Sequence, residues 1–184
     1  MENKITAPKW DLSCIYKSFE SEEYKNDFKR LEALEKELSL FFENKLFSTD
    51  FPQWVNLFLE KYNELQSIAV SLHAYAYSSY SVNTTNSQLI NQISSIENQF
   101  VAIEQITLKF STAFSQVVKD NPQTLTNLYT SFPHLKDYSF IFEETINLNK
   151  HNMSPEKEAL AGELNISGAE SFSRLQEQIT PTML

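Results

Sequence analysis

A run of apolar residues at alternating steps of four and three is the feature that most restricts how this chain folds. The run consists of Leu89, Ile93, Ile96, Phe100, Ile103, Thr107, Phe110, Phe114 and Val117, with Thr107 as its one polar member. Steps of three and four place side chains on one face of an α-helix, and the alternation is typical of a seam between helices packed side by side. The sequence therefore predicts a long helix with one buried face.

An earlier helix is predicted from Ser21 onward. Ser21 is a good N-cap, and Glu22 and Glu23 follow it in the first turn, where the helix dipole favours negative charge. The apolar stripe of this helix consists of Tyr24, Phe28, Leu31, Leu34, Leu38 and Phe41. We expect the helix to end near residues 45–47. The preceding residues, with Trp10 and Tyr16 as aromatic anchors, are predicted to form an irregular docking arm.

A second long helix is predicted from residue 50 onward. Thr49 and Asp50 can cap it, and Pro52 suits its first turn. Its apolar face consists of Trp54, Phe58, Tyr62, Leu65, Ile68, Leu72 and Tyr75. The polar turn SVNTTN at residues 81–86 separates it from the seam helix, so the two should lie antiparallel.

Composition agrees with an all-α fold. The 184 residues include only two glycines and six prolines, and 41% of them are hydrophobic, which is enough for a real core. We therefore predict an antiparallel bundle of three long helices followed by several short helices. The expected division is an arm plus long-helix bundle at residues 1–118 and a short-helix segment at residues 119–184.

Prolines break the second part into short helices. Pro122, Pro133 and Pro155 leave room only for short elements, with Asn121 and Ser154 as N-caps and Pro181 as the last stop. The predicted apolar positions are Leu125, Leu128, Phe132, Leu135, Tyr138, Ile141, Phe142, Ile146, Phe172, Leu175 and Ile179. These are more than four short helices can bury among themselves. We expect exposed apolar surface here, at Phe140, Phe142, Ile146 and Phe172.

Charge and the lack of sorting signals restrict the partners and the compartment. The formal net charge is −9, which disfavours binding to nucleic acid or to anionic lipid. We find no apolar segment of a secretion signal or a membrane span. The single cysteine, Cys14, cannot form an internal disulfide, which suits a reducing compartment. We expect a cytoplasmic protein.

The histidines do not form a metal-binding pattern. A metallopeptidase helix needs two histidines one turn apart with a glutamate between them, and His73, His134 and His151 each lack both companions. Nothing local supplies Cys14 with a base that would make it a nucleophile. We therefore assign no catalytic residue and no metal ligand in this segment.

Two surface features remain as candidates for contacts. The acidic pairs Glu97 with Glu104 and Glu143 with Glu144 could serve acid–base chemistry, but the first pair flanks the apolar seam as solvated edge charges do. Tyr77 points off the apolar stripe of its helix, and tyrosine offers apolar area together with a hydroxyl. Tyr77 is the candidate for substrate binding, with a packing role as the alternative.

Five short segments along the chain form a recognisable series: residues 10–13 (WDLS), 72–77 (LHAYAY), 83–86 (NTTN), 135–138 (LKDY) and 153–161 (MSPEKEALA). In this order they resemble the N-terminal region of the oligoendopeptidase F group of thimet-like M3 zinc metallopeptidases. Asn83 stands where the group usually has an acidic residue. The resemblance runs along the full chain.

The resemblance implies a larger enzyme. Members of this group bind zinc through an HExxH helix and a third glutamate in a helical C-terminal part, around a deep channel that admits short peptides. None of these positions exists here, so the resemblance implies an inactive N-terminal lobe that forms the wall or lid of the channel. It implies short peptides and its own catalytic domain as partners, zinc only in the parent enzyme, and a chain that continues past Leu184. The isolated segment is expected to self-associate or to hold its last turns loosely.

A stand-alone helical protein–protein interaction module is the alternative function. Such a module would present a groove or an acidic face of the bundle to a partner protein. A reading frame that continues into an HExxH motif would favour the peptidase, and a stop codon after Leu184 would favour the module.

Overall fold

The computed structural model describes residues 11–43, 46–151, 153 and 155–180, and these residues form helices and turns without a strand. The order of elements is α1 (Glu22–Phe41), α2 (Leu46–Thr49), α3 (Phe51–Ser81), α4 (Ser87–Asp120), α5 (Gln123–Ser131), the 3-10 helix η1 (Pro133–Tyr138), α6 (Ser139–Leu148), α7 (Pro155–Asn165), the π-helical turn η2 (Ile166–Glu170) and α8 (Ser171–Ile179). The all-α prediction is confirmed. The predicted roles of Trp10, Ser154 and Pro181 lie outside the described residues.

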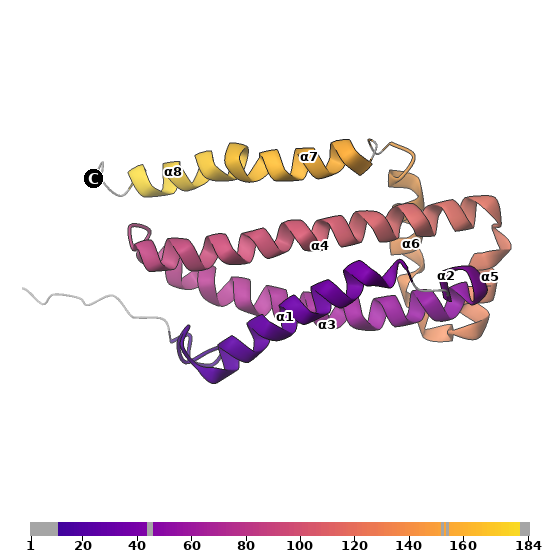
Figure 1. The fold of residues 1–184 in the computed structure, drawn as a ribbon, viewed down its shortest axis with the longest axis horizontal. Coiled ribbons are helices and arrows are strands. Elements are labelled where there is room, and N and C mark those ends of the chain that lie inside the picture. Colours follow the sequence, from indigo (N-terminus) through magenta and orange to yellow (C-terminus); the bar gives the residue numbers. More distant parts are fainter. Residues whose placement is uncertain (1–10, 44–45, 152, 154, 181–184) are drawn as a thin grey trace, which may run out of the picture.

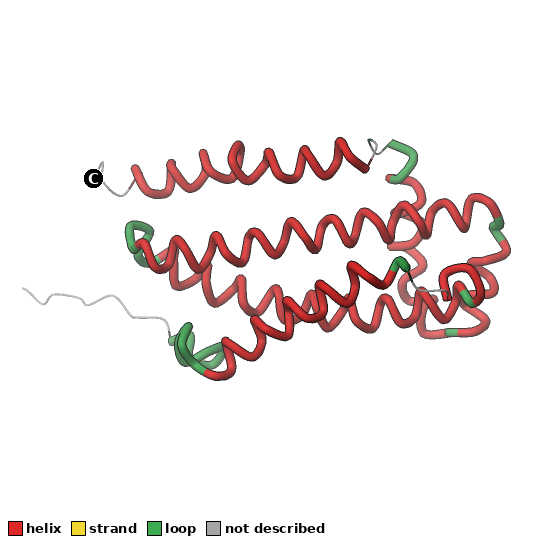
Figure 2. The backbone as a smooth tube through the Cα atoms, in the orientation of Figure 1, coloured by secondary structure: helices red, strands yellow, loops and turns green. Residues whose placement is uncertain are grey.

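The three long helices α1, α3 and α4 pack antiparallel to their neighbours in sequence (Figure 1). Helices α1 and α3 begin at predicted caps, and α4 begins directly after the predicted polar turn. The side chains of Ser21, Asp50 and Asn86 accept hydrogen bonds from the backbone N–H groups of Tyr24, Gln53 and Gln88, at 3.3, 3.1 and 2.9 Å. A short turn at residues 82–86 joins α3 to α4, as the tube in Figure 2 shows, and α2 lies between α1 and α3 in sequence. None of the described helices is long and apolar enough to span a membrane.

The first helix ends at Phe41, before the predicted residues 45–47. Aromatic packing explains the early end. Phe41, Phe42 and Phe47 all lie around the indole of Trp54, with ring centroids at 5.7, 6.0 and 5.0 Å. A continuous helix would carry Phe47 past the start of α3. Instead, α1 ends at Phe41, and α2 packs against α3 with Phe47 on the indole of Trp54.

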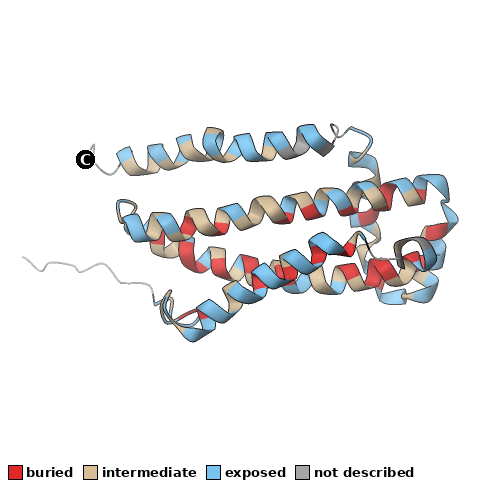
Figure 3. Cartoon of the chain, viewed as in Figure 1, coloured by how far each residue is buried: buried red, intermediate tan, exposed pale blue. Residues whose placement is uncertain are grey.

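The core lies where α1, α3 and α4 face one another, and buried residues concentrate there (Figure 3). Phe58 of α3 stacks on Phe110 of α4 at 4.1 Å and 6° between planes. The predicted arm docks through Tyr16, which is buried and meets the rings of Tyr24 and Tyr75 edge-on at 5.3 and 5.4 Å. Its hydroxyl donates to Asp27 Oδ2 at 2.6 Å.

The buried face of α4 differs in part from the predicted seam. Phe100 is half-buried and Thr107 is exposed, whereas Ile106 and Val118 are buried although the seam omits them. A straight α-helix has 3.6 residues per turn, so a strict step of 3.5 drifts off the buried face over a helix of this length. The Thr107 hydroxyl hydrogen-bonds to Tyr62 Oη at 2.8 Å, which satisfies it at the edge of the core.

The short helices α5 and α6, with η1 between them, cover one end of the bundle. Asn121 Oδ1 accepts from the backbone N–H of Gln123 at 3.2 Å, as predicted for the cap. Phe142 is not exposed as predicted: it is buried and stacks on Phe114 of α4 at 4.8 Å. Ile146 is half-buried, and Phe140 is 72% exposed as predicted.

The last helices α7 and α8 run along α4 in the opposite direction (Figure 1). The turn η2 joins them with non-helical torsions at Gly168, φ −95° and ψ −105°. Helix α8 buries no residue, and Phe172 is 72% exposed. The layer of α7 and α8 is therefore docked more lightly than the three long helices.

Candidate functional site

The three histidines lie on different elements: His73 on α3, His134 in η1, and His151 just after α6. Within the described ranges, no three His, Cys, Asp or Glu side chains lie together as metal ligands would. The zinc that the resemblance implies for the parent enzyme therefore does not fit the described residues of this chain. Cys14 is exposed in the N-terminal arm.

His73 has an aromatic setting. Its ring stacks on Tyr77 at 5.8 Å and meets Phe100 edge-on at 5.4 Å. Burial disfavours the charged imidazolium and lowers the pKa of His73 below its usual value. A neutral His73 acts here as a support for the ring of Tyr77.

Tyr77, the predicted binding residue, lies near the end of α3, with 46% of its surface exposed. Its hydroxyl donates to Glu177 Oε1 of α8 at 3.5 Å, a long hydrogen bond. Tyr77 thus lies where α3 and α8 approach each other. The sequence around Tyr77 does not predict this contact with α8.

A half-buried ion pair fixes α8 to α4 beside Tyr77. Arg174 Nη1 donates to Glu97 Oε2 at 2.8 Å and to Ser94 Oγ at 2.9 Å. The side chains of Arg174 and Glu97 are 20% and 21% exposed. Glu97 is therefore not the solvated edge charge that the sequence predicts, because α8 covers it. Glu104, Glu143 and Glu144 are exposed.

Burial is the main cause of an altered pKa at Glu97. It raises the pKa of the carboxyl, Arg174 lowers it, and the nearby carboxylates Glu170 and Glu177 raise it again. The cation of Arg174 thus only partly compensates the loss of water and the surrounding negative charge.

Around this ion pair lies a pocket of about 230 Å³ between α3, α4, η2 and α8. Its lining residues are Tyr77, Tyr80, Ile93, Glu97, Ala169, Glu170, Ser173, Arg174 and Glu177. A second hollow of about 530 Å³ adjoins it and shares Tyr77, Ser173 and Glu177. We call the smaller hollow the Tyr77 pocket.

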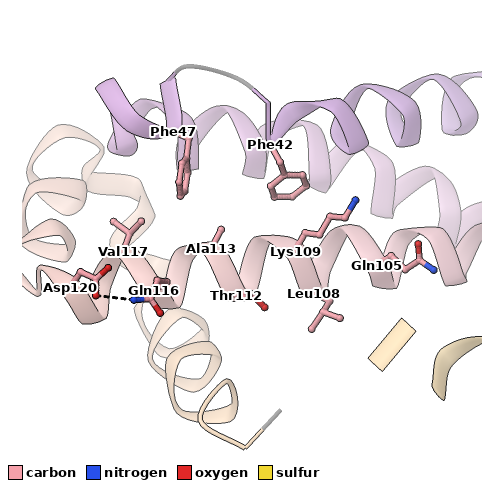
Figure 4. A pocket seen from close by; sticks show the side chains of 10 residues that line it. All are labelled: Phe42, Phe47, Gln105, Leu108, Lys109, Thr112, Ala113, Gln116, Val117 and Asp120. Carbon is pink, nitrogen blue, oxygen red and sulfur yellow. Dashed lines mark hydrogen bonds between the residues drawn. The ribbon is translucent and has the colours of Figure 1, made fainter. Parts of the chain in front are cut away.

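A separate apolar groove of about 620 Å³ lies at the other end of α4. The rings of Phe42 and Phe47 point down onto α4, where Ala113 and Val117 form the floor (Figure 4). Polar groups stand around it, including Asp120, which accepts a hydrogen bond from Gln116 at 2.8 Å. This groove can accept apolar side chains.

Residues 119–183 match the family model described as Oligopeptidase F, the N-terminal part of the M3 peptidases. The resemblance to oligopeptidase F is confirmed over these residues. The matched range contains the short helices α5 to α8 and therefore one side of the Tyr77 pocket. The match supports a non-catalytic N-terminal part of a peptidase. No curated protein and no solved structure matches the chain.

Sequence reasoning missed Arg174 as a member of this site. The spacing of Glu170, Arg174 and Glu177 was a usable signal, since steps of four and three place all three on one face of a helix. Nothing in the sequence indicated that this face would meet Glu97.

Proposed function

We propose that the chain is the N-terminal lobe of a zinc-dependent oligoendopeptidase that hydrolyses peptide bonds in short peptides. The lobe forms the wall or lid of the substrate channel and takes no part in the chemistry itself. Residues 1–118 provide the arm and the long-helix bundle, and residues 119–184 lead toward a catalytic domain. The match of residues 119–183 to the family model is the observation that carries the proposal.

The outer side of α7 and α8 supports this proposal. Leu160, Leu164 and Phe172 are 55%, 59% and 72% exposed, and Leu175 follows them with 48%. Exposed apolar side chains in such a group are typical of a surface that another protein part covers. The catalytic domain of the same enzyme is the partner that we propose for this surface.

The metal belongs to the proposed parent enzyme. Zinc bound there would supply polarisation of the peptide carbonyl and activation of water. The described residues of this chain offer no ligand set for it. The contribution of this lobe is selection of substrate by size, with Tyr77 as the proposed contact to the peptide. We further propose a cytoplasmic location.

The first experiment determines the reading frame that follows the Leu184 codon. An HExxH motif in frame supports the proposal, and a stop codon counts against it. In the parent enzyme, Tyr77→Ala should then raise KM for a quenched short peptide and change kcat little. Tyr129→Ala on α5, a half-buried tyrosine away from the Tyr77 pocket, is the matched control. Equal effects of the two substitutions would contradict a contact at Tyr77.

The apolar groove favours a second candidate, the stand-alone interaction module. It offers Phe42, Phe47 and Val117 to an apolar helix or loop of a partner. An in-frame stop codon together with a chain that is monodisperse by light scattering would favour this module over the peptidase lobe.

A further inference from the structure

The Tyr77 pocket carries more negative than positive charge. Glu97, Glu170 and Glu177 contribute three carboxylates, and Arg174 contributes one guanidinium. Among the described residues, the ion pair of Arg174 is with Glu97. The other two carboxylates accept hydrogen bonds from neutral groups, Glu170 from Asn165 at 2.9 Å and Glu177 from Tyr77 at 3.5 Å. With these side chains ionised, the three carboxylates and the single guanidinium leave the pocket with two excess negative charges.

A buried hydroxyl without a hydrogen-bond partner lines the same pocket. Tyr80 is 1% exposed, and its Oη makes no hydrogen bond of acceptable geometry. Burial raises the pKa of this phenol, and the charge and hydrogen-bonding capacity of the nearby Glu177 carboxylate raise it further. A buried polar atom that lacks a partner is costly, which indicates that the pocket is built to supply one.

The wall beside Tyr80 also suits a cation. Tyr77 lines both the pocket and the adjoining hollow, and an aromatic ring attracts a positive charge to its face. The carboxylates of Glu170 and Glu177, a phenol oxygen and an aromatic ring disfavour anions and offer acceptors to a group rich in N–H donors. A primary ammonium has three such donors on a compact cation.

We propose that the Tyr77 pocket binds a primary ammonium group, from a lysine side chain or from the free N-terminus of a peptide. Glu170 and Glu177 accept two of its N–H bonds and Tyr80 Oη accepts the third. The adjoining hollow leaves room for the chain that carries the ammonium. Only the identification of the ligand as a peptide rests on the proposed function. Binding of the ammonium group itself does not require that the protein belong to a peptidase.

The test is a titration of the 184-residue chain, followed by NMR at the rings of Tyr77 and Tyr80. Nα-acetyl-lysine amide offers a side-chain ammonium, alaninamide offers an N-terminal ammonium, and Nα-acetyl-norleucine amide is the uncharged control. We expect saturable shifts with at least one amine, weakened by added salt, and none with the control. The amine that binds more tightly identifies the source of the ammonium. Absence of saturation with both amines would overturn the proposal.

Variants separate this pocket from general attraction to an acidic chain. Glu177→Gln and Glu170→Gln should each weaken amine binding about tenfold, and Tyr80→Phe about threefold. Glu163→Gln, at an exposed position of α7, removes the same charge outside the pocket and should leave binding unchanged. Circular dichroism checks that each variant is folded. If Glu177→Gln unfolds, the test relies on Glu170→Gln. Equal losses in Glu163→Gln and in the pocket variants would refute the site. Because no peptidase assay is involved, this result stands apart from that of the reading frame.

Discussion

The ion pair between Arg174 and Glu97 should determine how firmly α8 is held. Helix α8 buries no residue, and Arg174 donates to both Glu97 and Ser94 on α4. Exposed ion pairs contribute about 0.2–1 kcal/mol, and removing one partner of a buried pair costs about 3–5 kcal/mol. With both side chains about one-fifth exposed, we expect Arg174→Gln to cost about 1–3 kcal/mol in the docking of α8.

Hydrogen exchange read by mass spectrometry measures this local free energy. Exchange in residues 171–179 should become faster by about 5- to 150-fold in Arg174→Gln, with α3 and α4 unchanged. The pKa of Glu97 should rise further in the same variant, because Arg174 is the cation that lowers it. A carbon-detected NMR titration of the carboxyl group reports that change.

A double-mutant cycle with Glu97→Gln tests whether the two residues act as a pair. The matched control is the more exposed pair of Lys61 and Glu37, at 2.6 Å, whose coupling should stay within about 0.5 kcal/mol. Unchanged exchange in residues 171–179, or a coupling energy between Arg174 and Glu97 no larger than that of the control, would refute this account of how α8 docks.

Three further predictions concern the core, alkaline pH and metal. Phe114→Ala should lower the free energy of unfolding by about 3–5 kcal/mol and the half-buried Phe100→Ala by clearly less, so equal shifts in denaturant midpoint would contradict the buried face of α4. Burial raises the pKa of Tyr24 to about 12, so its contribution to stability should be complete below pH 10 and lost as pH rises toward 12, costing about 2–3 kcal/mol in denaturant titrations. Ionisation of every tyrosine near pH 10 in the folded chain would contradict this. After dialysis, elemental analysis of the chain should find no stoichiometric zinc and a peptide assay no turnover.

The starts of the long helices could be predicted from sequence because capping is local. Ser21, Asp50 and Asn86 bond to backbone groups two or three residues ahead, so the signal and its effect lie in the same short segment. The end of α1 could not be predicted in this way. It depends on Trp54, which lies beyond the turn and gathers the rings of Phe42 and Phe47 around it.

The candidate site was less predictable than the fold, because its parts come from segments far apart in the chain. Tyr77 could be singled out from its place off the apolar stripe. Its partners could not: Glu97 and Arg174 are 77 residues apart, and periodicity alone describes Glu97 as an edge charge. Only the docking of α8 onto α4 turns Glu97 into a half-buried member of the Tyr77 pocket.

The order of α8 depends on contacts to both of its sides. Isolated helices shorter than about 12–15 residues are marginal in water, and α8 has nine residues. On one side, the polar contacts of Arg174 hold it to α4. On the other side, Phe172 and Leu175 remain exposed and contribute little until a partner covers them. Covering that outer side therefore stabilises α8, and with it the positions of Glu170 and Glu177 in the Tyr77 pocket. In the proposed peptidase, contact with the catalytic domain and binding of a cation in this pocket should consequently strengthen each other.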